Sequence, residues 1–488
     1  MNKLSCLVLL GAGLIPLASA DDQNLPAPTA HLQSLLELKA PATAPRALTI
    51  KGWKTLSGSK VLFIRTTELP MFDVHISFAA GSARDSAMAG LATATFGMLT
   101  EGVPGKDQAA IAETFDSLGA ELNMEIDHAR ATFSLRSLSD PAKSTPALNL
   151  LTQIVGEPLL SEERLSPIKN ELRAELAFQQ DDAGHLSKQR IKTLLAPNSP
   201  YSHPVYGTEQ GLAAITHSAV RNFHQQHYVA QTAQITLVGD LTLEQAKAFS
   251  LQISNALPAA GEPATVTASV SPAPDPVVGS HIERAQQQTH LLLAQPIVPR
   301  GHADYVALYA ANLILGGTHN SRLMKELRYK HGLVYEASSE IEEWAQGSLL
   351  TITLQTGAQF SVGTETLLRS LLSDFVRDGP TAEELDQLKR RLADMSAMSS
   401  ASNRQIVARL VKINRHDLPL DLDYTAQQVQ RLSLEDIRQA LNKHVAADGW
   451  QVVTVGATVE QLPLPPVSAP SDPTDQHRCR VNPGFVAS

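Results

Sequence analysis

The chain has 488 residues, of which 43% are hydrophobic, and it carries a formal net charge of -9. This length and composition are enough to bury ordinary hydrophobic cores and predict a globular protein of roughly two to four domains. Acidic and basic residues are interspersed without a basic cluster, which argues against nucleic-acid binding. No apolar stretch reaches the roughly 20 residues that a membrane span needs.

The first 20 residues have the pattern of a secretory signal peptide. Lys3 is followed by an apolar stretch at residues 4–17 and by Ala18-Ser19-Ala20, a small-residue cleavage site. We therefore expect cleavage near Ala20, export to the periplasm, and a short N-terminal extension at residues 21–44. A retained N-terminal anchor is the alternative.

Two cysteines are present, and one of them, Cys6, lies inside the expected signal peptide. The mature chain then keeps only Cys479, so no internal disulfide framework is expected. Cys479 is either a spare thiol in a loose tail or the site of an intermolecular bridge.

An internal repeat is the strongest pattern in the chain. An alternating strand at residues 74–78 is followed by a helical run at 90–99, and the same order returns at 290–294 and 306–315. The offset is about 215 residues in both comparisons. The sequence therefore predicts two copies of one structural unit.

Two further matches keep nearly the same offset. The helix start at residues 161–165 is similar to that at 381–385, and the strand end at 236–240 is similar to residues 453–457. Four ordered matches predict two homologous domains with a Pro- and Ala-rich linker between them. The expected boundaries are a first domain at 45–256, a linker at 257–278, a second domain at 279–460 and a flexible tail at 461–488.

Within each copy, alternating strands such as residues 131–135 and 349–354 are mixed with long amphipathic helices. The order lacks the regular strand-helix alternation of a nucleotide-binding fold. The predicted fold class is α+β, with two tandem homologous domains, each a mainly antiparallel sheet covered by helices on one face.

Several separated motifs resemble one family. Residues 72–102, Pro200 to Thr208, the Val238-Gly239-Asp240 strand end and residues 321–335 are similar, in this order, to the pitrilysin, insulin-degrading enzyme and mitochondrial processing peptidase family. The resemblance covers about residues 45–460 and includes the duplicated domain. It implies a metallopeptidase fold built from two similar halves.

Active members of that family carry an inverted zinc motif, H-x-x-E-H, on an early helix. Its histidines at i and i+4 share one helix face and bind zinc, while the glutamate activates water. Here Thr93 and Gly97 stand at the histidine positions and Phe96 at the glutamate position. None can do the required chemistry, so we expect no metal in this chain. Glu175 falls near the distal glutamate ligand, and we interpret it as structural.

His224 and His227 are the only closely spaced histidine pair in a helical segment of this sequence. Two ligands at i and i+3 without a nearby third indicate a solvated or packed helix face more than a metal site. We therefore do not assign a metal to them.

The second half keeps a substrate-binding pair of the family. Family members use an arginine and a tyrosine seven residues apart to hold the substrate near a zinc ion contributed by the other half, and Arg328 and Tyr335 match them. A guanidinium can donate to a peptide carbonyl, and a phenol can donate to a developing oxyanion. The alternatives are that Arg328 pairs with a helix carboxylate and that Tyr335 is a core strand residue.

The resemblance therefore implies a non-catalytic subunit of a heterodimeric peptidase. A homologous partner would carry the zinc, Arg328 and Tyr335 would complete its site, and extended or unfolded peptides would bind along an edge strand, to which residues 119–124 correspond. The alternative is a scaffold or assembly protein that uses the fold only for protein contacts. An independent hydrolase is disfavoured, because no G-x-S-x-G motif and no other zinc motif is present.

Overall fold

The computed structural model of the chain describes residues 48–197, 199–258, 279–344, 347–398 and 400–467. The expected signal peptide, N-terminal extension, most of the linker, and Cys479 lie outside these ranges. The described residues all belong to one compact unit that begins at Leu48. No helix within them is long and apolar enough to cross a membrane.

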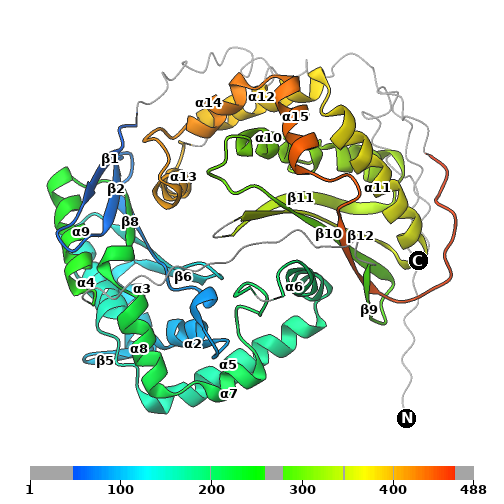
Figure 1. Cartoon of the computed structure of the whole chain (residues 1–488). Coiled ribbons are helices and arrows are strands. Elements are labelled where there is room, and N and C mark those ends of the chain that lie inside the picture. The colour runs from blue at the N-terminus through cyan, green and yellow to red at the C-terminus, as the bar shows by residue number, and fades with distance from the viewer. Residues whose placement is uncertain (1–47, 198, 259–278, 345–346, 399, 468–488) are drawn as a thin grey trace, which may run out of the picture. The chain divides into compact units, whose positions relative to one another are not determined.

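Two sheets form the framework (Figure 1). The first has the strand order β1-β2-β8-β3-β7-β6, in which only the β2–β8 pair is parallel. The second has the order β11-β12-β10-β13-β9, in which only the β13–β9 pair is parallel. The two sheets are thus mainly antiparallel, as predicted. Their strands are β1 (Lys51–Lys54), β2 (Lys60–Arg65), β3 (Met71–Phe78), β6 (Glu121–Ile126), β7 (Ala131–Leu138), β8 (Gln234–Gly239), β9 (Ser280–Glu283), β10 (Gln288–Ile297), β11 (Val334–Trp344), β12 (Gly347–Gly357) and β13 (Gln451–Gly456).

The helices of the first half lie between or after its strands. They are α2 (Leu91–Met98), α3 (Gln108–Leu118), α4 (Pro141–Gly156), α5 (Glu162–Asp181), α6 (Ala183–Leu195), α7 (Glu209–Ala214), α8 (His217–His227) and α9 (Leu243–Ala256). Two short 3₁₀ turns, η2 (Ser82–Arg84) and η3 (Ala230–Thr232), and a small hairpin of β4 (Gly102–Val103) and β5 (Lys106–Asp107) complete this half.

The helices of the second half follow the same order. They are α10 (Tyr305–Leu315), α11 (Ser361–Asp378), α12 (Ala382–Met398), α13 (Asn403–His416), α14 (Tyr424–Arg431) and α15 (Leu434–His444), with a π-helical segment η4 (Met324–Lys330) and a 3₁₀ turn η5 (Ala358–Phe360). The series α4, α5, α6 before β8 thus corresponds to α11, α12, α13 before β13. This confirms the predicted pair of homologous α+β domains.

The main core of the first half lies on one face of its sheet. Alternate residues of β3, including Phe72, Val74 and Ile76, are fully buried there. Phe78 follows them in the same row and packs on Phe133 and Tyr228, with ring centroids 6.0 and 5.1 Å away. The alternation of apolar residues with a period of two, seen in the sequence of this strand, therefore results from burial of one face of the sheet.

The opposite face of each sheet contacts a helix from the other half, which the sequence did not predict. Helix α13 packs on β2, β3 and β8, while α6 packs on β10 and β13. The first contact buries Ile406, Leu410 and Ile413 of α13 against Leu62, Ile64 and Val238. The second buries Ile191 and Leu195 of α6 against Leu292, Val453 and Val455. The expectation of helices on one face only was therefore incomplete.

A polar contact fixes α13 on the first sheet. The buried Asn414 side chain donates to the Ile235 carbonyl oxygen at 3.0 Å and to the Thr236 hydroxyl at 3.2 Å. Because α6 and α13 hold equivalent places in the repeat, the two halves exchange equivalent helices. The exchange places the C-terminal end of α13 beside the loop that follows β6.

The first residues after the second domain also have fixed contacts. The Leu462 N–H donates to the Gln359 carbonyl oxygen at 2.8 Å, and Leu464 packs against the second core. The expected tail thus begins with residues that touch η5 and the domain it follows.

Candidate functional site

Helix α2 carries the three positions that correspond to the zinc motif. It begins after Gly90, whose φ of 101° lies in the left-handed region that favours glycine. The N-cap residue Gly90 has no side chain to cap the helix. The buried Asp85 carboxylate instead accepts from the N–H groups of Gly90 and Ala92, both at 2.7 Å. Burial raises the pKa of Asp85 to about 7, although these two N–H donors oppose the shift.

The residues at the three motif positions are packed within the first half. Thr93 is buried, and its hydroxyl donates to the Val205 carbonyl oxygen at 2.6 Å. Phe96 is 8% exposed and its ring lies 5.4 Å from that of Phe133. Gly97 faces Ile168 of α5, so that a Cβ there would lie 3.4 Å from the Ile168 side chain.

These residues do not fit the zinc ion that the family fold implies. Phe96 and Gly97 have no ligand atom, and the Thr93 hydroxyl is engaged with a carbonyl. Zinc sites in proteins are built from Cys, His, Asp and Glu. Helix α2 is therefore a packed core helix, and no chemical step can be assigned to metal there.

Glu175 and the histidine pair are also placed by the structure. Glu175 is half-buried on α5 and accepts from the Gln179 side chain at 3.3 Å. His224 is buried on α8, with Nε2 2.9 Å from the Val155 carbonyl oxygen, and its ring stacks on Tyr228. His227 packs on Phe223 at 4.4 Å between ring centroids. The pair thus lies on a packed helix face.

Arg328 and Tyr335 meet outside the core of the second half. Arg328 is on η4 and Tyr335 is the second residue of β11, and the guanidinium carbon lies 4.8 Å from the Tyr335 ring centroid. The ring of Tyr329 lies 5.7 Å from the same carbon. Tyr335 is 80% exposed, so it is not a core strand residue.

Arg328 likewise forms no ion pair with the described part of the chain. Among the described residues, no carboxylate lies within 4.0 Å of its guanidinium, although Glu326 on the same segment pairs with Lys330 at 2.9 Å. Both structural alternatives for the pair are therefore contradicted. An exposed phenol and a half-buried guanidinium are thus left with a cation–π contact between them.

A free sheet edge lies in the first half. β6 is the last strand of the first sheet and, of the described strands, pairs only with β7. Its side chains alternate between exposed and half-buried. The residues predicted to be an edge strand, 119–124, thus overlap an edge strand that could accept a further strand.

A cavity of about 500 Å³ adjoins the end of β6. Its lining includes Ile126 of β6, Leu176 and Gln179 of α5, and Val205 and Tyr206, which precede α7. Val205 is the residue whose carbonyl accepts from Thr93. The cavity therefore lies beside the helix whose motif has lost its zinc ligands. We call it the edge-strand cavity.

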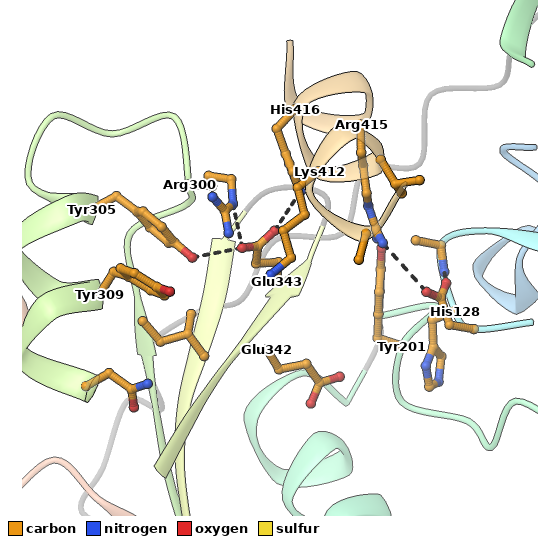
Figure 2. A pocket seen from close by; sticks show the side chains of 16 residues that line it. His128, Tyr201, Arg300, Tyr305, Tyr309, Glu342, Glu343, Lys412, Arg415 and His416 are labelled. Atoms are coloured by element: carbon orange, nitrogen blue, oxygen red, sulfur yellow. Dashed lines mark hydrogen bonds and ion pairs between the residues drawn. The ribbon is translucent and has the colours of Figure 1, made fainter. Parts of the chain in front are cut away.

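A second cavity of about 580 Å³ continues from it and is shown in Figure 2. It shares Asp127, His128 and Glu342 with the edge-strand cavity, and its lining comes from the loop that follows β6, from β11 and from α10 and α13. We call it the inter-sheet pocket. Sequence reasoning missed it, because its lining comes from segments far apart in the chain.

Glu343 is the centre of a polar network in the inter-sheet pocket. Its Oε1 accepts from Arg300 Nε at 2.6 Å and from the Tyr305 hydroxyl at 2.8 Å, and its Oε2 lies 3.1 Å from His416 Nε2 (Figure 2). Burial opposes ionisation, but the hydrogen bond from His416, the charge of Arg300 and the Tyr305 hydroxyl lower the pKa of Glu343 to about 2. Glu343 is thus a satisfied carboxylate.

A further cluster was also missed. His302, Asp304 and His444 bring ligand-type atoms within 4.8 Å of one another. Asp304 Oδ2 lies 2.7 Å from His444 Nε2 and accepts from Lys443 at 2.9 Å; these two contacts lower the pKa of Asp304 to about 2. A lysine ammonium has no lone pair for a metal, so the cluster reads as an ion-pair network.

Comparison with known proteins gives consistent results. A family model described as the peptidase M16 inactive domain matches residues 214–392. A solved structure of a peptidase M16 inactive domain from Pseudomonas fluorescens is 38% identical, with a TM-score of 0.80, covering 86% of this chain and 100% of that one.

Two more distant proteins agree. The non-peptidase homolog YmxG of Helicobacter pylori is 23% identical over 398 residues, which are 79% of this chain and 88% of that protein. The crystal structure of a protease from Helicobacter pylori, 16% identical, has the same fold with a TM-score of 0.77, covering 84% of this chain and 100% of that one.

The resemblance read from the sequence is thereby confirmed at the level of the family. Identity of 38% to an inactive-domain structure over 86% of the chain exceeds what a shared fold alone would give. With its packed motif helix and its duplicated domains, the chain belongs to the M16 peptidase family, as one of its inactive, non-peptidase members.

Proposed function

We propose that this chain is the substrate-binding, non-catalytic subunit of a two-subunit exported peptidase. A homologous partner chain would carry the zinc ion, and this chain would supply Arg328 and Tyr335 to the partner's active site. Export to the periplasm follows from the signal-like first 20 residues and is part of the proposal.

The observation that carries the proposal is the state of the Arg328–Tyr335 pair. Tyr335 is 80% exposed and Arg328 has no carboxylate partner among the described residues, so neither side chain is committed to the fold. The Arg328 guanidinium can donate to a substrate carbonyl, and the Tyr335 hydroxyl can donate to the oxyanion that develops during peptide hydrolysis. Such donors gain strength when a partner excludes water from them.

The free edge of β6 supports peptide binding. An extended peptide would add as a further strand through main-chain hydrogen bonds, and its side chains would enter the edge-strand cavity. This mode places few demands on peptide sequence, which suits extended or unfolded substrates.

The test is a peptidase assay with the partner alone and with this chain added. We expect activity only in the mixture, and a loss of about 10²- to 10³-fold in kcat/KM on Arg328→Met or Tyr335→Phe, the range for removing one oxyanion donor. Size-exclusion chromatography should show an unchanged complex for both variants.

Tyr329→Phe is the matched control. Tyr329 is 56% exposed and also lies near the Arg328 guanidinium, but it stands outside the predicted pair. Its activity should stay within about twofold of the wild type. Equal turnover by the partner with and without this chain would refute the proposal. A stable complex whose activity ignores Arg328→Met and Tyr335→Phe would instead favour the scaffold role.

A further inference from the structure

The acidic groups of the inter-sheet pocket already have hydrogen-bond or ion-pair partners. Glu343 is held by Arg300, Tyr305 and His416, as described above, and Glu342 pairs with Lys192 at 2.7 Å. Asp127 accepts from the backbone N–H groups of Ala129 and Arg130, both at 2.6 Å. These carboxylates therefore have little capacity left to bind a cationic ligand.

Two cations on α13 are less compensated. Lys412 has no carboxylate within 4.0 Å among the described residues, and Arg415 makes one long ion pair, with Asp127 at 3.9 Å (Figure 2). They are three residues apart and line the same pocket, so they lie on one helix face. One unpaired and one weakly paired cation beside the same cavity favour an anionic ligand.

The surroundings add positive charge. Arg130, the residue after Ala129 of the pocket lining, donates to the Ser77 hydroxyl and to the Ser77 carbonyl oxygen, both neutral groups. Burial, followed by the charges of Arg130 and Arg415, lowers the pKa of His75 to about 4, and burial, followed by the charge of Lys192, lowers that of His128 to about 4. Both histidines are therefore neutral at pH 7, because adding another proton is unfavourable here.

The pocket walls are suited to an organic anion. His128 stacks on Tyr201 with ring centroids 5.4 Å apart, and Tyr305 and Tyr309 line the side formed by α10. Asn312 also lines the pocket, is 7% exposed, and its buried Oδ1 has no hydrogen-bond partner in the described part of the chain. A ligand with an apolar part, an anionic group and an N–H donor would match these features.

The position of the pocket identifies the class of ligand. Asp127 and His128 directly follow β6 and line both cavities, so a strand added to β6 would lead into the inter-sheet pocket. We infer that this pocket binds a carboxylate of an extended peptide, through Lys412 and Arg415. The inference rests on the proposed peptide-binding function and names its preferred substrates as peptides with an acidic side chain or a free C-terminus near the bound strand.

Binding is measured on the isolated full chain by fluorescence anisotropy, with N-terminally labelled hexapeptides. One pair differs only by a free or an amidated C-terminus, and a second, amidated pair differs only by an internal Glu or Gln. We expect the carboxylate form of at least one pair to bind about tenfold or more tightly at low salt, and that pair identifies the source of the carboxylate.

The double variant Lys412→Met/Arg415→Met should remove this preference. Lys247→Met is the control for a lost surface charge, since Lys247 is exposed on α9 and outside the pocket, and it should keep the preference. Unchanged melting temperatures would show that all variants fold.

Equal affinities within both peptide pairs would overturn the inference, as would a preference that survives in the double variant. The proposed function fails on a different readout, the turnover of the partner with and without this chain. A subunit that activates its partner but ignores peptide charge would refute only the pocket assignment.

Discussion

Glu343 offers a sharp test of how the inter-sheet pocket is held together. Glu343→Gln keeps the size of the side chain but removes the charge that Arg300 and His416 face, and its amide nitrogen cannot accept a hydrogen bond. Breaking a buried ion pair costs about 3–5 kcal/mol. Because the Glu343 side chain is 21% exposed, we expect the lower end, about 3 kcal/mol of unfolding free energy at pH 7.

The pH dependence gives a second route to the stabilisation that the ionised Glu343 side chain contributes. The pKa of Glu343 falls from 4.5 to about 2 on folding, so the ionised carboxylate stabilises the fold above about pH 4.5, and this contribution is lost as the pH falls toward 2. Linkage converts the shift into roughly 3 kcal/mol at pH 7 and about half of that near pH 3. The free-energy difference between wild type and Glu343→Gln should shrink in the same window.

The assay is urea unfolding of both proteins from pH 7 to pH 3, followed by circular dichroism. Glu340→Gln is the matched control, because Glu340 is exposed on the same strand and should change stability by less than about 0.5 kcal/mol. A difference for Glu343→Gln that stays constant across this pH range, or is as small as that of the control, would refute the reasoning.

Three further substitutions test the packing around the site. Phe96→Ala should lower the unfolding free energy by about 3 kcal/mol in a urea titration, because it leaves a cavity in the first core, and a loss below about 1 kcal/mol would contradict the packed α2. Asp85→Ala should cost about 2–3 kcal/mol at pH 7, measured by calorimetry, since two buried N–H groups lose their acceptor. Asn414→Ala should cost about 2 kcal/mol and speed amide exchange in β8, whereas unchanged exchange there would show that α13 does not depend on this contact.

The elements that could be predicted from the sequence are those whose pattern is local. The strand at residues 74–78 alternates because one face of β3 is buried, whereas β10 is buried along nearly its whole length. The duplication was visible in the sequence because a strand followed by a helical run returns at the same offset. The resemblance then assigned Arg328 and Tyr335, and the structure adds that Tyr335 is exposed and that Arg328, half-buried, lies beside its ring.

The exchange of helices could not be predicted in the same way. Ile406, Leu410 and Ile413 recur at helical spacing, which shows that α13 buries one face but not which surface covers it. The partner surface is β2 and β8, more than 150 residues earlier in the chain. The inter-sheet pocket depends on this exchange, because Lys412 and Arg415 reach it only from the far half of the sequence.

The motif positions on α2 and the proposed Arg328–Tyr335 pair have different relations to the fold. Phe96 and Thr93 are buried and contribute to folding, so their present identities are explained by packing alone. Half-buried Arg328 and exposed Tyr335 share a cation–π contact worth about 0.5–1 kcal/mol, and the fold needs little from either. Exposed guanidinium and phenol groups gain most of their interaction energy when another molecule covers them and excludes water. The mixing experiment with a zinc-bearing partner creates that condition, which is why it discriminates between a substrate-binding subunit and a scaffold better than any measurement on the isolated chain.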